Sequence, residues 1–416
     1  MTEIKDRNFK LLSYKDRIFD VYQIVNNDFP LDKTVHIEIT KTLERDVNLF
    51  YIGKENSSLI IDGYRFEVFY SGGNTNHRIH LFDNNSRGLI IRNCNINFVS
   101  KSQVSFTAIH NFGGVDTHLD TQADLLSVEH CRISAHCHAI EYPYESALCG
   151  IENIFANSIS LTNNYLFIQN IGISEGQQAI GIRNSGRFAR IENNNIKANG
   201  SHNVGKLLEQ AHVYGVYNTG MYMVFNGNNC VGEWGGKSTG LYNSGAYANI
   251  TGNKILATHT IKGRTVVLAA EHCILSNNII TNTSRNPHFV DIFAGDNIIN
   301  CNYMQGLLGS WDYKSGCGIF VVGQGEQKVR RCNIVGNIVS CARDFGIVLL
   351  NTERNNIFGN QFIKFIEIED YVAVYGENSD DKISGNITDG TISINSGEGR
   401  DKVFRNYDEA VQSLLD

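Results

Sequence analysis

Proline, long apolar runs and closely spaced cysteine pairs are what this sequence lacks. Its 416 residues include 3 Pro, and no stretch has the ~20 apolar residues of a membrane span or the shorter apolar core of a secretion signal. The sequence therefore predicts no membrane partner and a cytoplasmic or phage-encoded protein. None of the 10 Cys forms a Cys-x-x-Cys motif, which favours reduced thiols. A net charge of -7 argues against a nucleic-acid partner.

One spaced pattern is present at least eleven times: an apolar residue, two variable residues, Asn or Cys, a variable residue, and usually another apolar one. The first copy spans Ile91 to Ile96 and the last spans Ile383 to Thr388. Successive copies lie 23 to 37 residues apart, a period typical of stacked supersecondary units. The fourth position falls at Cys94, Cys131, Asn164, Asn194, Asn228, Asn253, Asn278, Asn302, Asn337, Asn360 and Asn386.

The residues between these positions indicate strands. Apolar residues come in short alternating runs such as 88 to 91 and 346 to 350, without the 3.6-residue period of helical repeats. A unit of about 25 residues suits three short strands and three turns, so stacked units would build parallel sheets. We expect the repeated Asn to adopt the left-handed turn conformation and to hydrogen bond to its copies in neighbouring coils.

Over residues 50 to 395, this repeat resembles the right-handed parallel β-helices of the pectin-lyase-like superfamily. The resemblance implies an all-β solenoid of about 11 to 13 coils. Its members are mostly lyases and epimerases of uronic acid polymers, polygalacturonase-like hydrolases, fructan-converting transferases and phage tailspikes, many of them homotrimers. No closer family signature is present: the polygalacturonase Asn-Thr-Asp and Gly-His-Gly motifs and the Asp-Pro-His-Glu of alginate epimerases do not occur.

The ends of the chain do not carry the repeat. We expect residues 1–49 to form an N-terminal cap over the first coil, because an uncovered β edge invites pairing between chains. Residues 50–395 would form one elongated β-helix domain. Residues 396–416 would form a C-terminal cap or tail, with a short amphipathic helix at 407–415.

A second repeated element consists of a small residue, an aliphatic residue, a variable residue and often Asn. If the aliphatic residue points into the core, strand alternation places its two neighbours outside. One predicted exterior column is small: Ala108, Ala139, Gly181, Gly215 and Gly240. The other is His110, Glu141, Arg183, Tyr217 and Tyr242. Together these columns predict a polysaccharide groove, and the later outward positions Phe320, Val348 and Val374 predict an apolar stripe that needs a cover, either the C-terminal tail or a neighbouring subunit.

Insertions in the N-terminal half bring further candidates to the groove. Loops on a rigid scaffold usually carry binding and catalysis. The predicted substrate-binding residues are Asp116, His118, Asp120, Asp124, Tyr142 and Tyr242.

Two chemistries suit this set. In β-elimination or C5 epimerisation of a uronic acid unit, Arg183 would neutralise the carboxylate, His110 would be the base, and Tyr217 would be the acid or a base activated by Arg183. In a glycoside hydrolase or fructan-type transferase, Glu141 would pair with a carboxylate of the 116 to 124 loop. A non-catalytic carbohydrate-binding or phage tail module is the third alternative. No resident metal is expected; calcium held by Glu141 and the acidic loop is the alternative that the resemblance implies.

Overall fold

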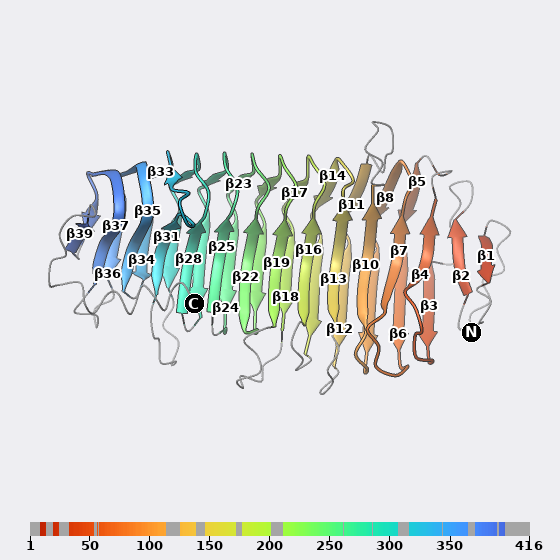
Figure 1. The fold of residues 1–416 in the computed structure, drawn as a ribbon. Helices are drawn as coiled ribbons and strands as arrows, with labels where there is room; N and C mark the ends of the chain where they lie inside the picture. The colour runs from red at the N-terminus through yellow and green to blue at the C-terminus, as the bar shows by residue number, and fades with distance from the viewer. Residues whose placement is uncertain are drawn as a thin grey trace. The chain divides into compact units, whose positions relative to one another are not determined.

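The computed structural model is a right-handed parallel β-helix, as the resemblance implied (Figure 1). It describes residues 9–13, 20–24, 33–53, 56, 58–113, 125–138, 146–171, 177–200, 211–260, 262–284, 286–306, 316–342, 344–364, 371–388 and 391–395. These residues form strands and turns. No helix in this described part is long and apolar enough to cross a membrane. The helix predicted at 407–415 lies outside the described residues.

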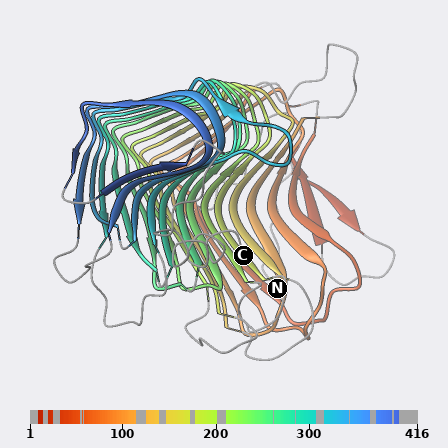
Figure 2. The same ribbon diagram turned by 60° about the vertical axis from the view of Figure 1, so that its left-hand side comes forward.

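Contacts divide the chain into two compact units. Unit 1 consists of Met1–Val224, Asn228–Cys230 and Trp234–Gly236, and unit 2 consists of Phe225–Gly227, Val231–Glu233 and Lys237–Asp416. Strands β20 (Val224–Asn226) and β21 (Asn229–Glu233) are divided between them. Within each unit, most coils contribute three strands, and Figure 2 shows successive coils following one another.

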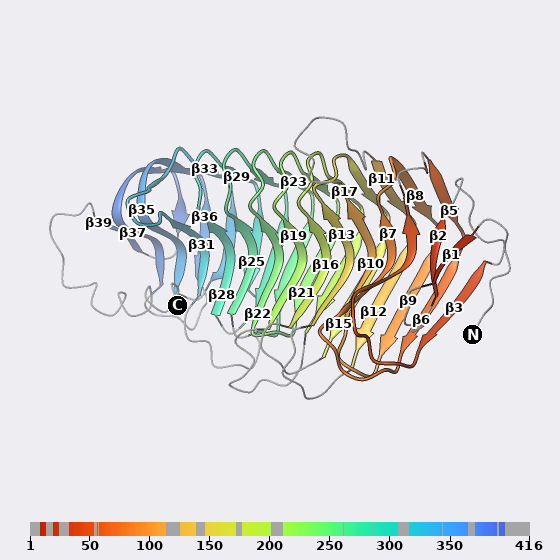
Figure 3. The same cartoon turned by 45° about the vertical axis from the view of Figure 1, so that its right-hand side comes forward.

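In unit 1, the first strands of the coils pair in parallel, as do the second and the third strands; β6, β9, β12 and β15 lie side by side in Figure 3. The first strands are β4 (Val47–Ile52), β7 (Arg78–Asn84), β10 (Ser105–Phe112), β13 (Ala147–Ile154), β16 (Gln178–Asn184) and β19 (His212–Asn218). The second strands are β5 (Leu59–Asp62), β8 (Gly88–Arg92), β11 (Leu125–Glu129), β14 (Ile159–Thr162) and β17 (Arg190–Glu192). The third strands are β3 (Thr34–Ile39), β6 (Arg65–Tyr70), β9 (Asn95–Ser100), β12 (Arg132–Cys137), β15 (Tyr165–Asn170) and β18 (Asn195–Asn199).

Unit 2 repeats this arrangement. Its first strands are β22 (Lys237–Asn243), β25 (Lys262–Leu268), β28 (Asn286–Ile292), β31 (Cys317–Val322), β35 (Phe345–Phe358), β37 (Val372–Ser384) and β39 (Thr391–Asn395). The second strands are β23 (Asn249–Thr251), β26 (Ile274–Ser276), β29 (Ile298–Asn300), β32 (Val329–Arg330) and β33 (Asn333–Val335). The third strands are β24 (Lys254–Thr258), β27 (Ile279–Thr283), β30 (Tyr303–Gly306), β34 (Ile338–Ala342), β36 (Gln361–Lys364) and β38 (Ile387–Thr388).

Parallel pairing begins before residue 50. Strand β3 pairs in parallel with β6, and β2 (Asp20–Ile24) pairs in parallel with β4. Strand β1 (Phe9–Ser13) is antiparallel to β2. Residues 34–39 and 47–49 of the predicted N-terminal cap therefore lie in the parallel sheets themselves.

The predicted aliphatic column lies inside the coils. Ile109, Ile182 and Val216 of unit 1 are fully buried, and so is Leu241 of unit 2. The small column beside it also lies inside, against the prediction. A Cβ added to Gly181 would lie 2.3 Å from Cγ2 of Ile196, a core residue of the facing β18. The coil bends at this position. The residue before the small one and the residue after the aliphatic one therefore point outward, and the small residue between them does not.

Buried asparagines link successive coils in ladders. In unit 2, the side chain of Asn278 donates to Ile250 O at 3.0 Å and to Asn302 Oδ1 at 2.9 Å, while its own Oδ1 accepts from the backbone N–H of Asn253 at 2.9 Å. The left-handed residue is the one before each rung, such as Asn277 with φ 56°, which corrects the prediction that the rung itself is left-handed. Because the chain changes direction at that preceding residue, the rung can point inward.

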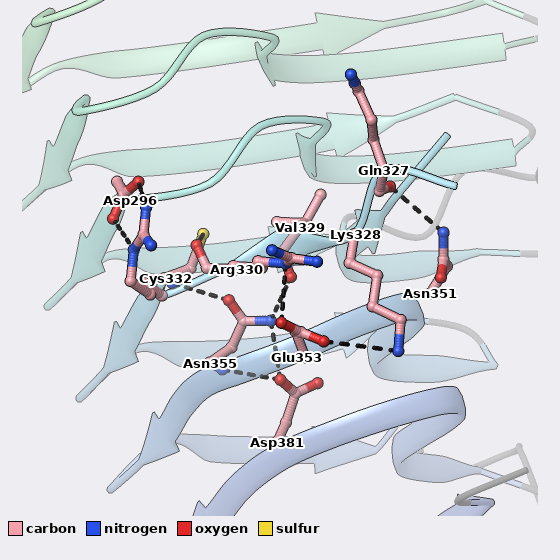
Figure 4. A network of polar contacts seen from close by, with 11 residues as sticks. Asp296, Gln327, Lys328, Val329, Arg330, Cys332, Asn351, Glu353, Asn355 and Asp381 are labelled. Carbon is pink, nitrogen blue, oxygen red and sulfur yellow. Dashed lines mark hydrogen bonds and ion pairs between the residues drawn. The ribbon is translucent and has the colours of Figure 1, made fainter. Parts of the chain in front are cut away.

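A further ladder in unit 2 ends on an acidic residue. Asp381 Oδ1 accepts from the backbone N–H of Asn355 at 2.8 Å and from its side-chain amide at 2.9 Å (Figure 4). Asn355 Oδ1 in turn accepts from the backbone N–H of Cys332 at 2.8 Å. These contacts give Asp381 a structural role.

The predicted apolar stripe is buried within this chain. Phe320 and Val348 point to the side of the sheet opposite Ile319 and belong to one buried apolar cluster. Val374 does not belong to the stripe, because it pairs with the inward Ile347. A stripe that is already covered offers no subunit interface.

We predict that Asn278→Ala destabilises the fold by about 2 to 5 kcal/mol, because it leaves several buried partners without a hydrogen bond. Urea unfolding followed by circular dichroism measures the change. Asn333→Ala, at an exposed position of unit 2, is the matched control and should stay within about 0.5 kcal/mol of wild type. Equal stability of the two variants would contradict the ladder's role.

Candidate functional site

The candidate site lies on the outer face of the first strands of unit 1. Parallel register brings one residue from each of five successive strands into a column. Asp83 of β7 pairs with His110 of β10, His110 with Glu152 of β13, Glu152 with Arg183 of β16, and Arg183 with Tyr217 of β19. The structure therefore brings together three of the predicted catalytic residues, His110, Arg183 and Tyr217.

The predicted Glu141 does not occupy the column. Between His110 and Arg183 the register places Glu152, from the segment Gly150 to Asn153, in place of the predicted segment 139 to 142. Glu141 itself lies outside the described residues, as do the predicted substrate-binding residues Asp116, His118, Asp120, Asp124 and Tyr142. Tyr242 is half-buried on β22 of unit 2.

The Asn that ends the second repeated element would have identified Glu152 in the sequence. The segment 150 to 153 ends in Asn, as do 108 to 111 and 181 to 184, whereas the predicted segment ends in Tyr142. These Asn side chains are buried and form their own ladder: Asn111 donates to Asn153 at 2.7 Å, and Asn153 donates to Asn184 at 2.7 Å. The same ending at Asn84 would have identified Asp83.

His110 and Asp83 form a hydrogen-bonded pair. His110 Nδ1 lies 2.8 Å from Asp83 Oδ1, and the Asn48 side-chain amide donates to Asp83 Oδ2 at 2.5 Å. An ionised Asp83 accepts the proton on Nδ1, so the neutral imidazole keeps its lone pair on Nε2. A carboxylate in this position also stabilises the imidazolium that forms when Nε2 takes a proton. The Asp83 contact therefore fixes the orientation of the His110 imidazole.

Glu152 is a buried carboxylate held by two arginines. Its side chain is 2% exposed; Arg183 Nη1 lies 3.1 Å from Oε1 and Arg78 Nη1 lies 3.3 Å from Oε2. Arg78 comes from β7, two coils away, so its long side chain crosses β10 to reach Glu152. Both arginine side chains remain about a third exposed, at 30% and 34%. Glu152 therefore positions two guanidinium groups at the surface.

Arg183 links this pair to Tyr217. The guanidinium carbon of Arg183 lies 5.5 Å from the centroid of the Tyr217 ring, within the range of a cation–π contact. Tyr214 packs edge-on against Tyr217 at 5.1 Å between centroids. The predicted neighbours Arg183 and Tyr217 are thus in contact, with aromatic packing fixing the phenol.

His80 completes the cluster and was not anticipated from the sequence. Its ring stacks on His110 with centroids 4.3 Å apart, and its Nδ1 lies 3.0 Å from Asn48 Oδ1. Its Nε2 is buried without a hydrogen-bond partner. Burial, and then the neighbouring His110, lower the pKa of His80 to about 3, so this imidazole is neutral near pH 7.

Two groups of residues in the described part of the chain could hold a metal ion. His80, His110 and Glu152 each offer a ligand atom, and these atoms lie within 4.8 Å of one another. Two guanidinium groups already contact the Glu152 oxygens, and their charge opposes a divalent cation there. The second group, Glu271, His272 and Asp296, is more exposed, and Arg331 forms an ion pair with its Asp296. The site in unit 1 is better suited to an anion than to a cation.

No family model matches this chain, and no curated protein matches it. Among solved structures, the chain is similar to the A-module of the Azotobacter vinelandii mannuronan C-5 epimerase AlgE6, with 10% identity over 84% of this chain and 91% of that one, at a TM-score of 0.31. The periplasmic alginate epimerase AlgG shows 12% identity over 90% of this chain and 76% of that one, at a TM-score of 0.34. The Dettilon tailspike protein gp208 shows 14% identity over 84% of this chain and 62% of that one, at a TM-score of 0.30. These are similarities of fold.

We predict that His80 makes the fold less stable in acid. Below about pH 6.5 the unfolded chain binds a proton at His80, while the folded protein stays neutral there until about pH 3, so the unfolded state binds more protons and stability falls as pH falls through this window. Between pH 7.5 and 4.5 this contribution is about 2 to 3 kcal/mol.

Urea unfolding of wild type and His80→Phe at both pH values measures the effect. The variant keeps an aromatic ring beside His110 but cannot titrate, so its stability should fall less than that of wild type by the amount above. Parallel losses in the two proteins would show that His80 is protonated as easily in the folded state as in the unfolded one.

Proposed function

We propose that this protein processes an anionic polysaccharide by β-elimination or C5 epimerisation at a uronic acid unit. One observation carries the proposal: a buried Glu152 holds the guanidinium groups of Arg78 and Arg183 at the surface beside the Asp83–His110 pair. This combination supplies a cationic site for a carboxylate and an oriented base for a proton next to it.

The arginines would neutralise the sugar carboxylate. The C5 proton of a uronic acid is weakly acidic because its removal places negative charge on the adjacent carboxylate, so cationic hydrogen-bond donors aimed at that group lower the barrier. Each guanidinium carries five N–H donors, and Glu152 contacts one nitrogen of each. The other donors can meet the two oxygens of a substrate carboxylate.

His110 would remove the proton. Its Nε2 takes the C5 proton, the C4–O bond breaks, a C4–C5 double bond forms, and the Tyr217 phenol protonates the departing oxygen. In epimerisation the C4–O bond stays intact and a proton returns to C5 from the opposite face. General base catalysis of this kind contributes roughly 10² to 10⁴ in rate.

Hydrolysis and glycosyl transfer have less support. Both need a carboxylic acid that donates a proton and a second carboxylate that acts as base or nucleophile. In the described residues of this site, the carboxylates are Asp83 and Glu152. The first is hydrogen bonded to His110 and Asn48, and the second is 2% exposed with both oxygens in contact with guanidinium groups, so neither is open to a glycosidic oxygen.

We predict that the purified protein raises absorbance near 235 nm when incubated with polygalacturonate or polymannuronate, because elimination forms an unsaturated uronate. His110→Ala should lower the rate by about 10² or more, since the base is lost. Arg183→Ala and Arg78→Ala should each lower it by a similar order, since the carboxylate is less neutralised. Tyr217→Phe should lower turnover without preventing binding.

Two control variants remove the same side-chain types elsewhere in unit 1: His130→Ala and Arg92→Ala, both at exposed positions. They should keep wild-type rates. Because arginines serve as the cation, a chelator should not change the rate, whereas dependence on calcium would contradict this part of the proposal. Exchange of the C5 proton in deuterated water without absorbance would indicate epimerisation, and reducing ends without absorbance would indicate hydrolysis. If the protein binds either polymer but produces no absorbance, no proton exchange and no reducing ends, it is a binding module.

A further inference from the structure

Unit 2 contains a charged group of its own on its first strands. Arg264 of β25 pairs in register with His288 of β28, and Val267 pairs with Asp291. Asp291 and His288 are 0% and 5% exposed, whereas the Arg264 side chain is 41% exposed. A buried carboxylate thus lies beneath a surface arginine.

Asp291 contacts His288 through a hydrogen bond and Arg264 through an ion pair. His288 Nδ1 lies 2.8 Å from Asp291 Oδ1, and Arg264 Nε lies 3.1 Å from Asp291 Oδ2. The guanidinium carbon lies 5.8 Å from the centroid of the Phe293 ring. The Arg264 contact is an ion pair without a hydrogen bond to Oδ2, so the terminal Nη1 and Nη2 donors form the edge of the guanidinium that can meet a second oxyanion.

Stability does not account for this ion pair. The adjacent members of the Asp291 column are Val267 and Phe320, and the next strand adds Val348. Apolar side chains therefore fill the same column in neighbouring coils. Replacing a buried ion pair by apolar residues is often neutral or stabilising, so an arginine–aspartate pair in such a column calls for another role.

The arrangement matches that of the candidate site in unit 1. There, buried Glu152 lies 3.1 Å from Arg183, whose guanidinium carbon is 5.5 Å from the Tyr217 ring. In both places a buried carboxylate orients a partly exposed arginine that also contacts an aromatic ring. The aromatic contact and the ion pair restrict the guanidinium, which lowers the entropy lost when it binds a planar anion.

We propose that Arg264, oriented by Asp291, is a second binding site for the carboxylate of a uronic acid unit. The polymer class rests on the proposed function of unit 1, while the oxyanion chemistry rests on unit 2 alone. This site has no counterpart of the Asp83–His110 pair aimed at a bound sugar, because His288 is itself held by Asp291 and nearly buried. It would bind without reacting.

The test is the number of oligosaccharides bound. Isothermal titration with a trisaccharide of polygalacturonate or polymannuronate is performed on full-length protein carrying His110→Gln, so that the ligand is not consumed. We expect a stoichiometry of about two. It should fall to about one in Arg264→Leu combined with Asp291→Asn, a pair of changes that leaves no unpaired buried charge. Arg183→Ala should also leave about one, now at Arg264.

Controls separate folding and general charge from the site. Arg264→Lys keeps a cation beside Asp291 but loses the planar fork, so it should fold normally and still weaken the second site by about tenfold. Lys254→Ala, at an exposed position of unit 2, removes the same charge and should keep both sites.

The outcomes distinguish the two proposals. A single wild-type site that depends on Arg183 but not on Arg264 overturns the second site and keeps the first. A single site that depends on Arg264 but not on Arg183, in a protein that produces no unsaturated product, keeps the second site and overturns the proposed function. Binding of sulfated dextran but of neither uronate at Arg264 overturns the carboxylate assignment, and absence of any binding overturns both.

Discussion

The hydrogen bonds between buried asparagines of successive coils are the interaction on which the rest of the structure depends. A strand side chain changes face with every residue, so a slip of one position would move a whole column from the surface to the core. An amide that is buried in one coil and bonded to the next has a large penalty for such a slip, because donors and acceptors would be left without partners. The Asn111, Asn153 and Asn184 rungs directly follow the functional column by one residue. They therefore keep His110, Glu152 and Arg183 in register.

Buried carboxylates then organise the surface charges. Glu152 and Asp291 each cost free energy to bury, and each is compensated by arginine. The buried acids also restrict the arginines. A long arginine side chain on an exposed strand would sample many rotamers, whereas one that must neutralise a buried acid has few. A β-helix can hold such groups on strands, which are more rigid than loops. Its outer face thus presents oriented guanidinium groups, and in unit 1 a histidine oriented by Asp83 stands in the same column of strands.

Several parts of this protein could be predicted from the sequence. The eleven-fold pattern predicted the solenoid, because only a residue with a repeated place in the fold needs to recur at one position of every coil. The second repeated element predicted that His110, Arg183 and Tyr217 share a column. The exterior small column was wrong because strand alternation breaks at the bend: the rings of Tyr214 and Tyr217, three residues apart, pack against each other, while Gly215 between them is buried. The left-handed residue was predicted one position too late, at the rung Asn278 and not at Asn277, because the turn precedes the rung.

Repetition by itself determined the fold class, the number of strands in a coil and the inward position of the aliphatic and asparagine residues, since these follow from local sequence and from stacking identical units. The tertiary structure decided which acid stands between His110 and Arg183. Coils differ in length, so counting residues cannot show whether Glu141 or Glu152 aligns with His110 and Arg183. The backbone pairing of β13 with β10 and β16 shows that Glu152 does. It also decided the contact of Arg78 with Glu152, 74 residues apart, because a side chain that crosses an intervening strand leaves no periodic trace in the sequence.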